Sequence, residues 1–242
     1  MTKNKPMNKK LSYKDYLDGT AKIINESKVE KEKYYTKILG RKFAVYPNVF
    51  SPKYFLDTKF FAQKLPIRKN EEFLEIGPGS GVTVVFAALR GAKHVTAIDI
   101  NPTAVANTKE NAQINGVEEK VTVLHGNLYE PLGKDSKFDT IYWNTPFGYV
   151  NNDKNLTVLE KAVFDPEYQA TEQFIKQAKN HLKENGRLLI GFSTTLGKFD
   201  LLQKLLQESG YSVKLIAKTK SQETHPVLFE IFEAIPLKNK NK

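Results

Sequence analysis

Short apolar runs alternate with segments of helical periodicity along residues 73–192, and this alternation limits the chain to few folds. The apolar runs are Phe73–Ile76, Val95–Ile98, Val121–Leu124, Thr140–Trp143 and Leu188–Phe192. Helical patterns lie between most of them, roughly at Val82–Arg90, Thr103–Ile114 and Glu167–Leu182. Continuous apolar strands separated by helices form a parallel sheet that is covered on both faces. We therefore expect an α/β fold with a doubly wound sheet.

The end of the chain departs from this alternation. A helical pattern near Lys198–Glu208 is followed by two strand-like segments, Ser212–Ala217 and Val227–Ala234, with no helix between them. Because parallel strands need a long crossover, these two strands are expected to pair antiparallel. The predicted sheet is therefore seven-stranded and mostly parallel, with an antiparallel C-terminal hairpin.

Residues 1–42 are predicted to form a short, basic helical extension beside a domain that spans residues 43–242. Residues 1–10 are polar and charged, so we expect them to be disordered. Two sets of apolar positions have helical spacing: Tyr13, Tyr16, Leu17, Ala21 and Ile24, then Tyr34, Tyr35, Ile38 and Leu39. Gly40 is a plausible end for the second helix. Residues 43–52 contain two prolines and are expected to be extended.

The positive charge of the chain is concentrated near its start. The formal net charge is +10, and residues 1–70 carry 17 Lys and Arg against 6 Asp and Glu. A basic segment beside a neutral domain can steer anionic partners such as nucleic acid. The same lysines alternate with Glu, as on the solvated face of a helix. The charge leaves both interpretations open.

Composition excludes several kinds of site. The chain has no cysteine, which excludes disulfides, Cys-ligated zinc and thiol catalysis. Its four histidines show no metal-ligand spacing, so no metal is expected. No apolar run approaches the roughly 20 residues that span a bilayer, and the first ten residues lack the apolar core of a secretory signal. We expect a soluble, cytoplasmic protein with no membrane partner.

A glycine-rich turn follows the first apolar run of the predicted sheet. Its sequence is Gly77-Pro78-Gly79-Ser80-Gly81, and glycines there let backbone N–H groups approach a ligand at a helix N-terminus. A dinucleotide fingerprint would need glycine at position 82, which is Val82, and no P-loop is present. Asp99 ends the next apolar run, where an acid can accept hydrogen bonds from both ribose hydroxyls. Ile100 is a candidate for an adenine slot, with a plain core role equally consistent.

The turn, together with Glu75 and Asp99, resembles class I S-adenosylmethionine-dependent methyltransferases over roughly residues 43–235. The resemblance implies S-adenosyl-L-methionine (SAM) as cofactor. It also implies that the turn and Glu75 hold the methionine end of SAM and that Asp99 holds its ribose. Asn127 and Leu128 lie in a segment similar to the one that reads the adenine amino group. In most relatives an Asp stands at the position of Asn127, and Asn also offers a carbonyl acceptor.

The fourth apolar run leads into Asn144-Thr145-Pro146-Phe147, which is similar to the N-P-P-[YF] signature of methyltransferases that modify planar amino groups. The nitrogen of such a group has a delocalised lone pair. An Asn side-chain carbonyl and the next backbone carbonyl can hold its two hydrogens and orient it toward the methyl donor. The aromatic ring can pack on the flat target. Thr145 replaces the first proline of the signature, and its backbone carbonyl remains an acceptor.

The nearest resemblance within this group is to HemK-type enzymes, which implies a protein glutamine amide as acceptor. Residues 46–52 with Thr58 resemble the segment that precedes the glycine turn in those enzymes and in related ribosomal RNA enzymes. The N-terminal region is shorter than their helical substrate domain, so release factor is not implied as substrate. We expect transfer to a protein amide or a small molecule. An RNA or DNA base amino group is an alternative, and a non-catalytic cofactor-binding scaffold is a further one.

Overall fold

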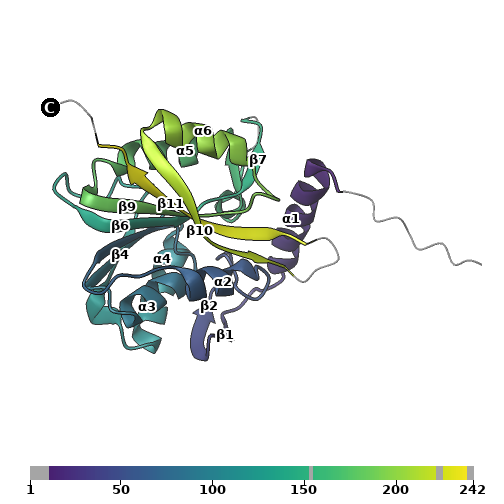
Figure 1. Cartoon of the computed structure of the whole chain (residues 1–242). Coiled ribbons are helices and arrows are strands. Elements are labelled where there is room, and N and C mark those ends of the chain that lie inside the picture. The colour runs from purple at the N-terminus through teal and green to yellow at the C-terminus, as the bar shows by residue number, and fades with distance from the viewer. Residues whose placement is uncertain (1–10, 153–154, 222–225, 239–242) are drawn as a thin grey trace, which may run out of the picture.

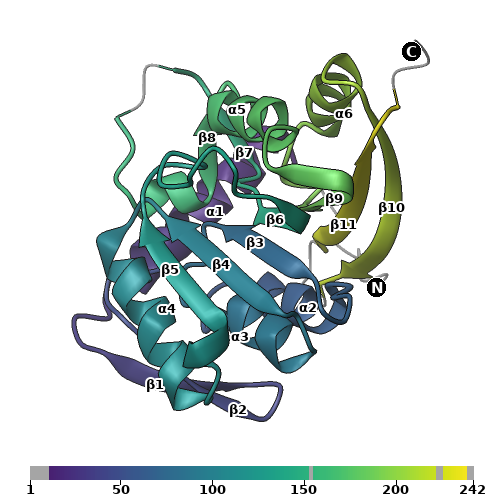
Figure 2. The same cartoon turned by 90° about the vertical axis from the view of Figure 1, so that its left-hand side faces the viewer.

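A seven-stranded sheet forms the centre of the computed structural model, which describes residues 11–152, 155–221 and 226–238. Its strands are β3 (Glu72–Ile76), β4 (His94–Asp99), β5 (Val121–His125), β6 (Phe138–Asn144), β9 (Leu182–Phe192), β10 (Tyr211–Lys220) and β11 (Leu228–Pro236). They lie in the order β10-β11-β9-β6-β3-β4-β5 (Figures 1 and 2). Strands β3, β4, β5, β6 and β9 are parallel to one another, whereas β11 pairs antiparallel with β9 and β10. The predicted fold class is confirmed.

Helices cover both faces of this sheet (Figure 1). α2 (Asp57–Lys64), α3 (Val82–Leu89) and α4 (Pro102–Ile114) lie on one face, and α5 (Gln169–Ala178) and α6 (Phe199–Glu208) lie on the other. No helix in the described part of the chain is long and apolar enough to cross a bilayer. The layers match the doubly wound arrangement expected from the sequence.

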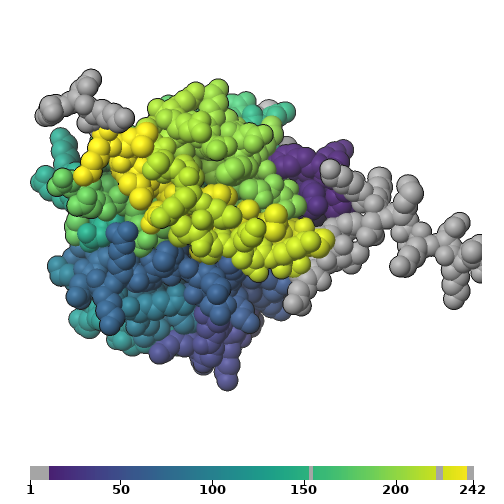
Figure 3. Space-filling view, in the orientation of Figure 1, coloured from purple at the N-terminus to yellow at the C-terminus, as the bar shows by residue number. Residues whose placement is uncertain are grey.

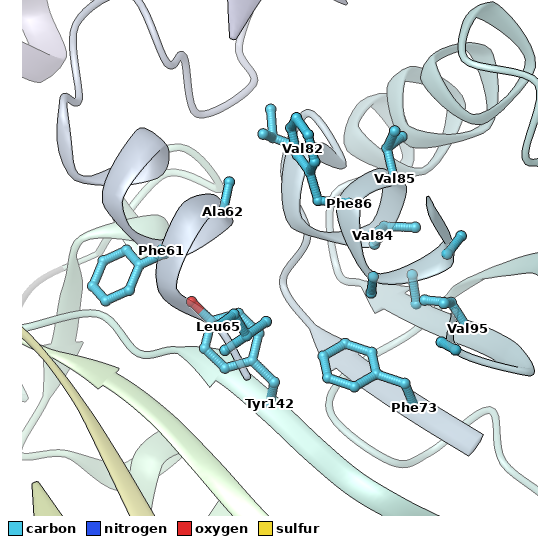
Figure 4. Close-up of a cluster of buried hydrophobic side chains, with 14 of the residues drawn as sticks. Phe61, Ala62, Leu65, Phe73, Val82, Val84, Val85, Phe86, Val95 and Tyr142 are labelled. Carbon is cyan, nitrogen blue, oxygen red and sulfur yellow. The ribbon is translucent and has the colours of Figure 1, made fainter. Parts of the chain in front are cut away.

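Alternate side chains of the strands supply the two apolar cores. Phe73 and Tyr142 point toward α2 and α3, and Figure 4 shows Tyr142 in one apolar cluster with Phe61 of α2 and with Leu65, which follows α2. The residues next to these along the strands face the opposite core. There the Trp143 ring lies 5.2 Å from that of Phe174 on α5. A strand residue therefore faces one core or the other according to whether its position is odd or even. Asn144 follows Tyr142 by two and faces the α2 side.

The segment predicted as a second helix is a β-hairpin, so this prediction is wrong. β1 (Tyr34–Ile38) pairs antiparallel with β2 (Arg41–Val45). Leu39 and Gly40 form the two-residue turn, with φ of 49° and 82°. Positive φ at both central positions is the geometry of the tight hairpin turn whose twist matches the strands. The glycine serves the hairpin rather than a helix end, and the predicted boundary between residues 42 and 43 falls within β2.

The predicted helix over Glu167–Leu182 is too long at its C-terminal end. α5 ends at Ala178, and β9 begins at Leu182, which pairs with Phe138 of β6. Pairing with the sheet takes the residues that helical periodicity assigned to the helix. The eight-residue α2 was not predicted as a helix. Two 3-10 turns, η1 (Glu118–Lys120) and η2 (Glu160–Ala162), and a short parallel pair, β7 (Gly148–Val150) and β8 (Phe164–Pro166), complete the fold.

The predicted N-terminal helix is present as α1 (Tyr13–Ser27). Ser12 and Asp15 form a reciprocal capping box that starts it. Ile24 is buried in a cluster with Val150 of β7 and Phe164 of β8. In the space-filling view α1 lies against the body of the molecule, near the ends of β10 and β11 (Figure 3). Residues 1–10, expected to be disordered, lie outside the described residues.

Candidate active site

Two neighbouring cavities lie at the carboxyl ends of the parallel strands, the edge at which open α/β sheets bind ligands. The first, of about 380 Å³, is bordered by Gly77, Gly79 and Asp99, and we call it the glycine-loop cavity. The second, of about 240 Å³, is bordered by α1 and α2, and we call it the helix cavity. Phe50, Asn144 and Ala162 line both. Asn144 therefore lies in the wall between them.

The glycine turn owes its shape to two positions where a side chain would not fit. Gly77 has a φ of 60°, and a Cβ there would lie 2.9 Å from Nε1 of Trp143. Gly81 has a φ of 73°, and its Cβ would lie 2.8 Å from the Thr108 side chain on α4. Both positions combine a left-handed backbone with close packing, so they require glycine. The turn is thereby pressed between β6 and α4.

The N–H groups of this turn are already used within the protein. Gly77 donates to the Ile98 carbonyl at 2.8 Å, Gly79 donates to Asp99 Oδ2 at 3.0 Å, and Gly81 donates to the Pro78 carbonyl at 2.8 Å. The expectation that glycine N–H groups approach a ligand is not met at these three positions. Because anion sites are built from free N–H groups, the turn is poorly suited to phosphate.

Two buried asparagines of α4 bond to the β1–β2 hairpin and the residue after it, and one of them, Asn111, also bonds to the glycine turn. Asn111 Nδ2 donates to the carbonyls of Ser80 at 2.8 Å and Ala44 at 2.7 Å. Its Oδ1 accepts from the Ala44 N–H at 2.7 Å. Asn107 bonds in the same way to Ala44 and Tyr46. These amides satisfy buried backbone groups and hold the β1–β2 hairpin against α4.

Asp99 is buried at the end of β4 and lines the glycine-loop cavity. Its Oδ2 accepts from Gly79 at 3.0 Å, and its Oδ1 accepts from the Asn101 N–H at 2.8 Å. Burial raises its pKa to about 6, partly offset by these two backbone N–H groups. The carboxylate is therefore held in one orientation, with lone pairs left for a ligand.

Glu75 lies behind the turn and is not among the residues that line the cavity. Its carboxyl is buried and accepts a short hydrogen bond from the Thr83 hydroxyl on α3. Burial, with a smaller contribution from the charge of Asp99, raises its pKa to about 8, and the Thr83 hydrogen bond partly offsets this. Oε2 of Glu75 has no hydrogen-bond partner among the described residues. A buried acid with a free oxygen is matched to a cationic group.

The remaining predicted cofactor residues divide into two groups. Ile100, Asn127 and Leu128 line the glycine-loop cavity, whereas Pro78, Ser80 and Gly81 shape the turn without lining that cavity. Pro146, predicted as part of the acceptor motif, also lines it. Asn127 makes two long contacts of 3.4 Å to Glu130, so its amide is weakly held. The structure thus brings together Asp99, Ile100, Asn127 and Asn144 around one cavity.

Two residues that follow β6, Thr145 and Phe147, line the helix cavity. Thr145 donates through both its N–H, at 3.1 Å, and its hydroxyl, at 3.0 Å, to the Gly191 carbonyl of β9. A proline at this position could make neither bond, so Thr145 fixes the turn by hydrogen bonds rather than by a ring. Phe147 lines the helix cavity, where its ring packs against Phe192 and Phe229.

Asp57, the first residue of α2, is a site residue that the sequence did not reveal. It is buried, lines the helix cavity and accepts from Asn144 Nδ2 at 3.3 Å through Oδ2. Burial raises its pKa to about 6. The only signal in the sequence is an acid before Thr58 and two phenylalanines, a pattern typical of an ordinary helix start. Only the tertiary contact distinguishes it.

The helix cavity has mostly apolar walls. Tyr16, Leu17 and Ile23 of α1 face Phe55 and Phe229 across it. Tyr13 fastens the start of α1 by accepting from the Tyr149 N–H at 2.8 Å. Asp15 and Asp57 are the charged residues among the described lining residues, which include no Lys, Arg or His. No group of three or more His, Asp or Glu in the described ranges could hold a metal ion.

Comparisons with known proteins agree on one family. A sequence model of the methyltransferase small domain matches residues 40–222. A candidate protein N5-glutamine methyltransferase of Methanocaldococcus jannaschii is 32% identical over 187 residues, which cover 76% of this chain and 91% of that protein. The release factor glutamine methyltransferase of Aquifex aeolicus is 28% identical, covering 73% of this chain but 66% of its own length.

Solved structures share the fold at low identity. A tRNA m1G37 methyltransferase of M. jannaschii has a TM-score of 0.59 at 21% identity, covering 86% of this chain and 56% of that one. A candidate methyltransferase complexed with SAH has a TM-score of 0.61 at 12% identity, covering 84% of this chain and 56% of that one. At these identities the likeness concerns the fold alone.

Proposed function

The chain belongs to the methyltransferase small-domain family, and we propose that it transfers the methyl group of SAM to a planar amide nitrogen. The observation that carries this proposal is the position of Asn144 in the wall between the two cavities. A residue there can touch a donor bound on one side and an acceptor bound on the other. We infer that the glycine-loop cavity takes SAM and that the helix cavity takes the acceptor.

The residues around the glycine-loop cavity fit a cationic cofactor. The turn offers no free N–H at its three glycines, Asp99 supplies negative charge, and the buried Glu75 has an unpartnered oxygen and can ionise beside a cation. In this proposal Asp99 accepts hydrogen bonds from the ribose hydroxyls, and Glu75 pairs with the amino group at the methionine end of SAM. Ile100, Asn127 and Leu128 border the adenine. When bound, SAM supplies an electrophilic methyl group on a positively charged sulfur.

Asn144 and Thr145 are proposed to hold the acceptor nitrogen. Oδ1 of Asn144 is buried and has no partner among the described residues, so it is available to a donor. The N–H and hydroxyl of Thr145 are bound to Gly191, which fixes the neighbouring peptide. Two carbonyl oxygens in a fixed position can accept hydrogen bonds from the two hydrogens of an amide NH2 group. These hydrogen bonds strengthen as the hydrogens become more acidic in the transition state. Pro146 and Phe147 complete this wall.

A protein glutamine amide is the acceptor class that we favour, with a small molecule as the second candidate. Relatives of this chain are named for glutamine methylation, and the described lining residues of the helix cavity carry only negative charge. A phosphate-bearing acceptor would be repelled by Asp15 and Asp57. We further propose that α1 is a lid over this cavity, within an extension of residues 1–42, and that the protein works in the cytoplasm.

Transfer of labelled methyl from SAM into a cell extract tests this function. The extract is divided and treated with protease, with nuclease or by size filtration, and labelled protein is digested to amino acids. We expect the label to be sensitive to protease and to be recovered as N5-methylglutamine. Label that nuclease removes would assign a nucleic-acid acceptor, and label that passes the filter would assign a small molecule. No transfer to any fraction would contradict the proposed activity.

A further inference from the structure

Four buried side-chain atoms lack a hydrogen-bond partner among the described residues, and they converge at one place. They are Oδ1 of Asp57, Oε2 of Glu75, the Tyr142 hydroxyl and Oδ1 of Asn144. Glu75 and Tyr142 are register partners on β3 and β6, and Asn144 follows two positions later on the same face. Buried polar atoms are almost always paired. Their grouping therefore marks a place where polarity serves function rather than stability.

Asp57 joins this group to the proposed acceptor wall. Its Oδ2 accepts from Asn144 Nδ2 at 3.3 Å, and Asp57 is 3% exposed. An Asn side chain can present either its NH2 or its oxygen in a given direction, and a carboxylate can only accept. With the NH2 directed at Asp57, the Asn144 oxygen is left without a partner. The reverse orientation would place that oxygen against the carboxylate, which is repulsive in a buried environment.

We propose that Asp57 is the positioning residue of Asn144: it holds the Asn144 NH2 so that the carbonyl oxygen is the group offered to the acceptor N–H. This inference rests on the proposed function, because it assumes that Asn144 binds the acceptor. An ionised Asp57 also polarises the amide, which makes the Asn144 oxygen a stronger acceptor as the transition state forms.

The fold holds Asp57 rigidly enough for this role. It begins α2, where the helix N-terminus favours a negative charge. The next turn of α2 places Phe60 and Phe61 in the apolar core, in the same cluster as Tyr142 (Figure 4). This packing fixes the backbone position of Asp57. The preceding residue, Leu56, is exposed, whereas the Asp57 side chain is buried.

The titratable groups around Asp57 are acids and phenols. Tyr142 faces it from β6, and burial, followed by the charges of Glu75 and Asp57, raises the pKa of that hydroxyl. Asp15 and Tyr16 of α1 and Tyr54, which precedes α2, line the same cavity. The described lining residues include no cation that would keep Asp57 ionised at low pH. Loss of its charge on acidification should therefore weaken the orientation of Asn144.

The test compares Asp57→Ala and Asp57→Asn with the wild-type chain, using the acceptor identified by the labelling experiment. Asn at position 57 can still accept from Asn144 through its oxygen but cannot titrate. We expect Asp57→Ala to lower kcat by about tenfold to a hundredfold, the range for a lost hydrogen bond to a charged group. The Kd for SAM and the KM for the acceptor should stay within about threefold. Asp57→Asn should recover part of kcat, to a level between that of Asp57→Ala and that of the wild type, because it keeps the acceptor for Asn144 but not the charge.

The pH profile separates positioning from a structural role. At saturating SAM and acceptor, wild-type kcat should rise as the pH passes upward through about 6, whereas kcat of Asp57→Asn should not change there. Asp139→Asn is the matched control, because Asp139 lies at the opposite end of β6 and pairs with Lys183 at 2.7 Å. It should keep wild-type kcat and pH profile.

Failure of this inference is distinguishable from failure of the proposed function. A wild-type chain that transfers no methyl group to any acceptor contradicts the function itself. An active wild type whose kcat and pH profile are unchanged in both Asp57 variants contradicts only the positioning role. Equal loss of kcat, SAM binding and thermal stability in both variants would make Asp57 a folding residue and overturn the inference.

Discussion

Single residues decide the charge of the site. Three acids, Asp57, Glu75 and Asp99, are buried at one edge of the sheet, and burial raises the pKa of each. Buried acids without cationic partners are unfavourable in the free protein. Such a cost is commonly retained where a ligand will supply the opposite charge, and it leaves the site arranged before the ligand arrives. The free protein is therefore organised for a positive ligand.

Asp99 offers the most direct test of cofactor binding. Asp99→Ala should weaken SAM binding by ~1.5–3 kcal/mol, because charge-assisted hydrogen bonds to the ribose are lost. Because the pKa of Asp99 is raised to about 6, wild-type affinity should fall as the pH is lowered through that value and the carboxylate becomes protonated. Asp99→Asn should bind weakly and lack this step. Calorimetry at pH 5 and pH 7.5 measures both, and parallel pH profiles would refute the assignment.

Gly191 tests the space in which Asn144 lies. A Cβ at this position would lie 2.6 Å from Asn144 Oδ1 and 3.0 Å from the Phe61 ring. Gly191→Ala should displace the Asn144 side chain and lower kcat by about tenfold to a hundredfold, while SAM affinity changes little. Gly133→Ala is the control, because its nearest neighbour is a Ser136 hydroxyl at 3.7 Å. Unchanged kcat in Gly191→Ala would show that methyl transfer does not depend on where the Asn144 side chain lies.

At the scale of elements, periodicity predicted the central sheet because its middle strands β3, β4, β6 and β9 are largely buried on both faces. It failed where tertiary pairing overrides local pattern. Tyr34 and Ile38 have helical spacing, yet a left-handed turn at Leu39 and Gly40 makes a hairpin. Leu182 fits a helix but pairs with the sheet.

The candidate site was predictable to a similar degree. The glycine turn, Asp99 and Asn144 were found because their chemistry follows strand ends, where an open α/β sheet gathers ligand-binding residues. Asp57 was not found, because it begins a short helix and meets Asn144 only in three dimensions. The helix cavity was not predictable for the same reason, since α1, α2 and β11 are far apart in sequence.

Removal of α1 tests the proposed lid. Deletion of residues 1–29 ends before β1, so it spares the hairpin that Asn107 and Asn111 anchor. The truncated chain should fold and bind SAM, but methyl transfer should drop by at least about tenfold, because water enters the helix cavity. Lys22→Ala, on the exposed face of α1, should be fully active. Full activity of the truncated chain would contradict the lid.

The same truncation decides the role of the basic segment. If the Lys residues within 1–29 contact nucleic acid, the intact chain should bind RNA with an affinity that falls steeply with salt, by about 0.9 units of log Kd per phosphate contact for each tenfold change in salt on a duplex. We expect weak RNA binding that the truncation leaves unchanged. Tight binding that disappears with the segment would replace the lid by a nucleic-acid contact.

At the scale of the whole molecule, the raised acids make stability depend on pH in an unusual direction. Groups with lowered pKa values, such as Asp139 and Glu160, add stability as the pH rises but have ionised in both states by about pH 5. An acid with a raised pKa acts in the opposite sense, since the folded state holds a proton that the unfolded state has lost. From pH 5 to pH 8 the free protein should therefore become less stable.

Glu75→Gln isolates the largest of these contributions. Between pH 6 and pH 8 the pKa values of Asp57 and Asp99, about 6, have been passed, while that of Glu75, about 8, has not. The unfolded chain binds fewer protons than the folded chain in this window, so wild-type stability should fall by up to about 1.4 kcal/mol per pH unit. At this chain length that corresponds to a melting temperature lower by about 2–4 °C per kcal/mol. Gln keeps the acceptor for Thr83 but cannot titrate, so the variant should melt at nearly the same temperature at pH 6 and pH 8 and above the wild type at pH 8.

Saturating SAM should raise the melting temperature of the wild type more than that of the variant, because only the wild type gains a charge partner. Thermal melts at pH 5, 6, 7 and 8, with and without SAM, give all of these values. Wild-type and variant curves that remain parallel from pH 6 to pH 8 would show that Glu75 does not titrate there and would remove its proposed role at the amino end of the cofactor.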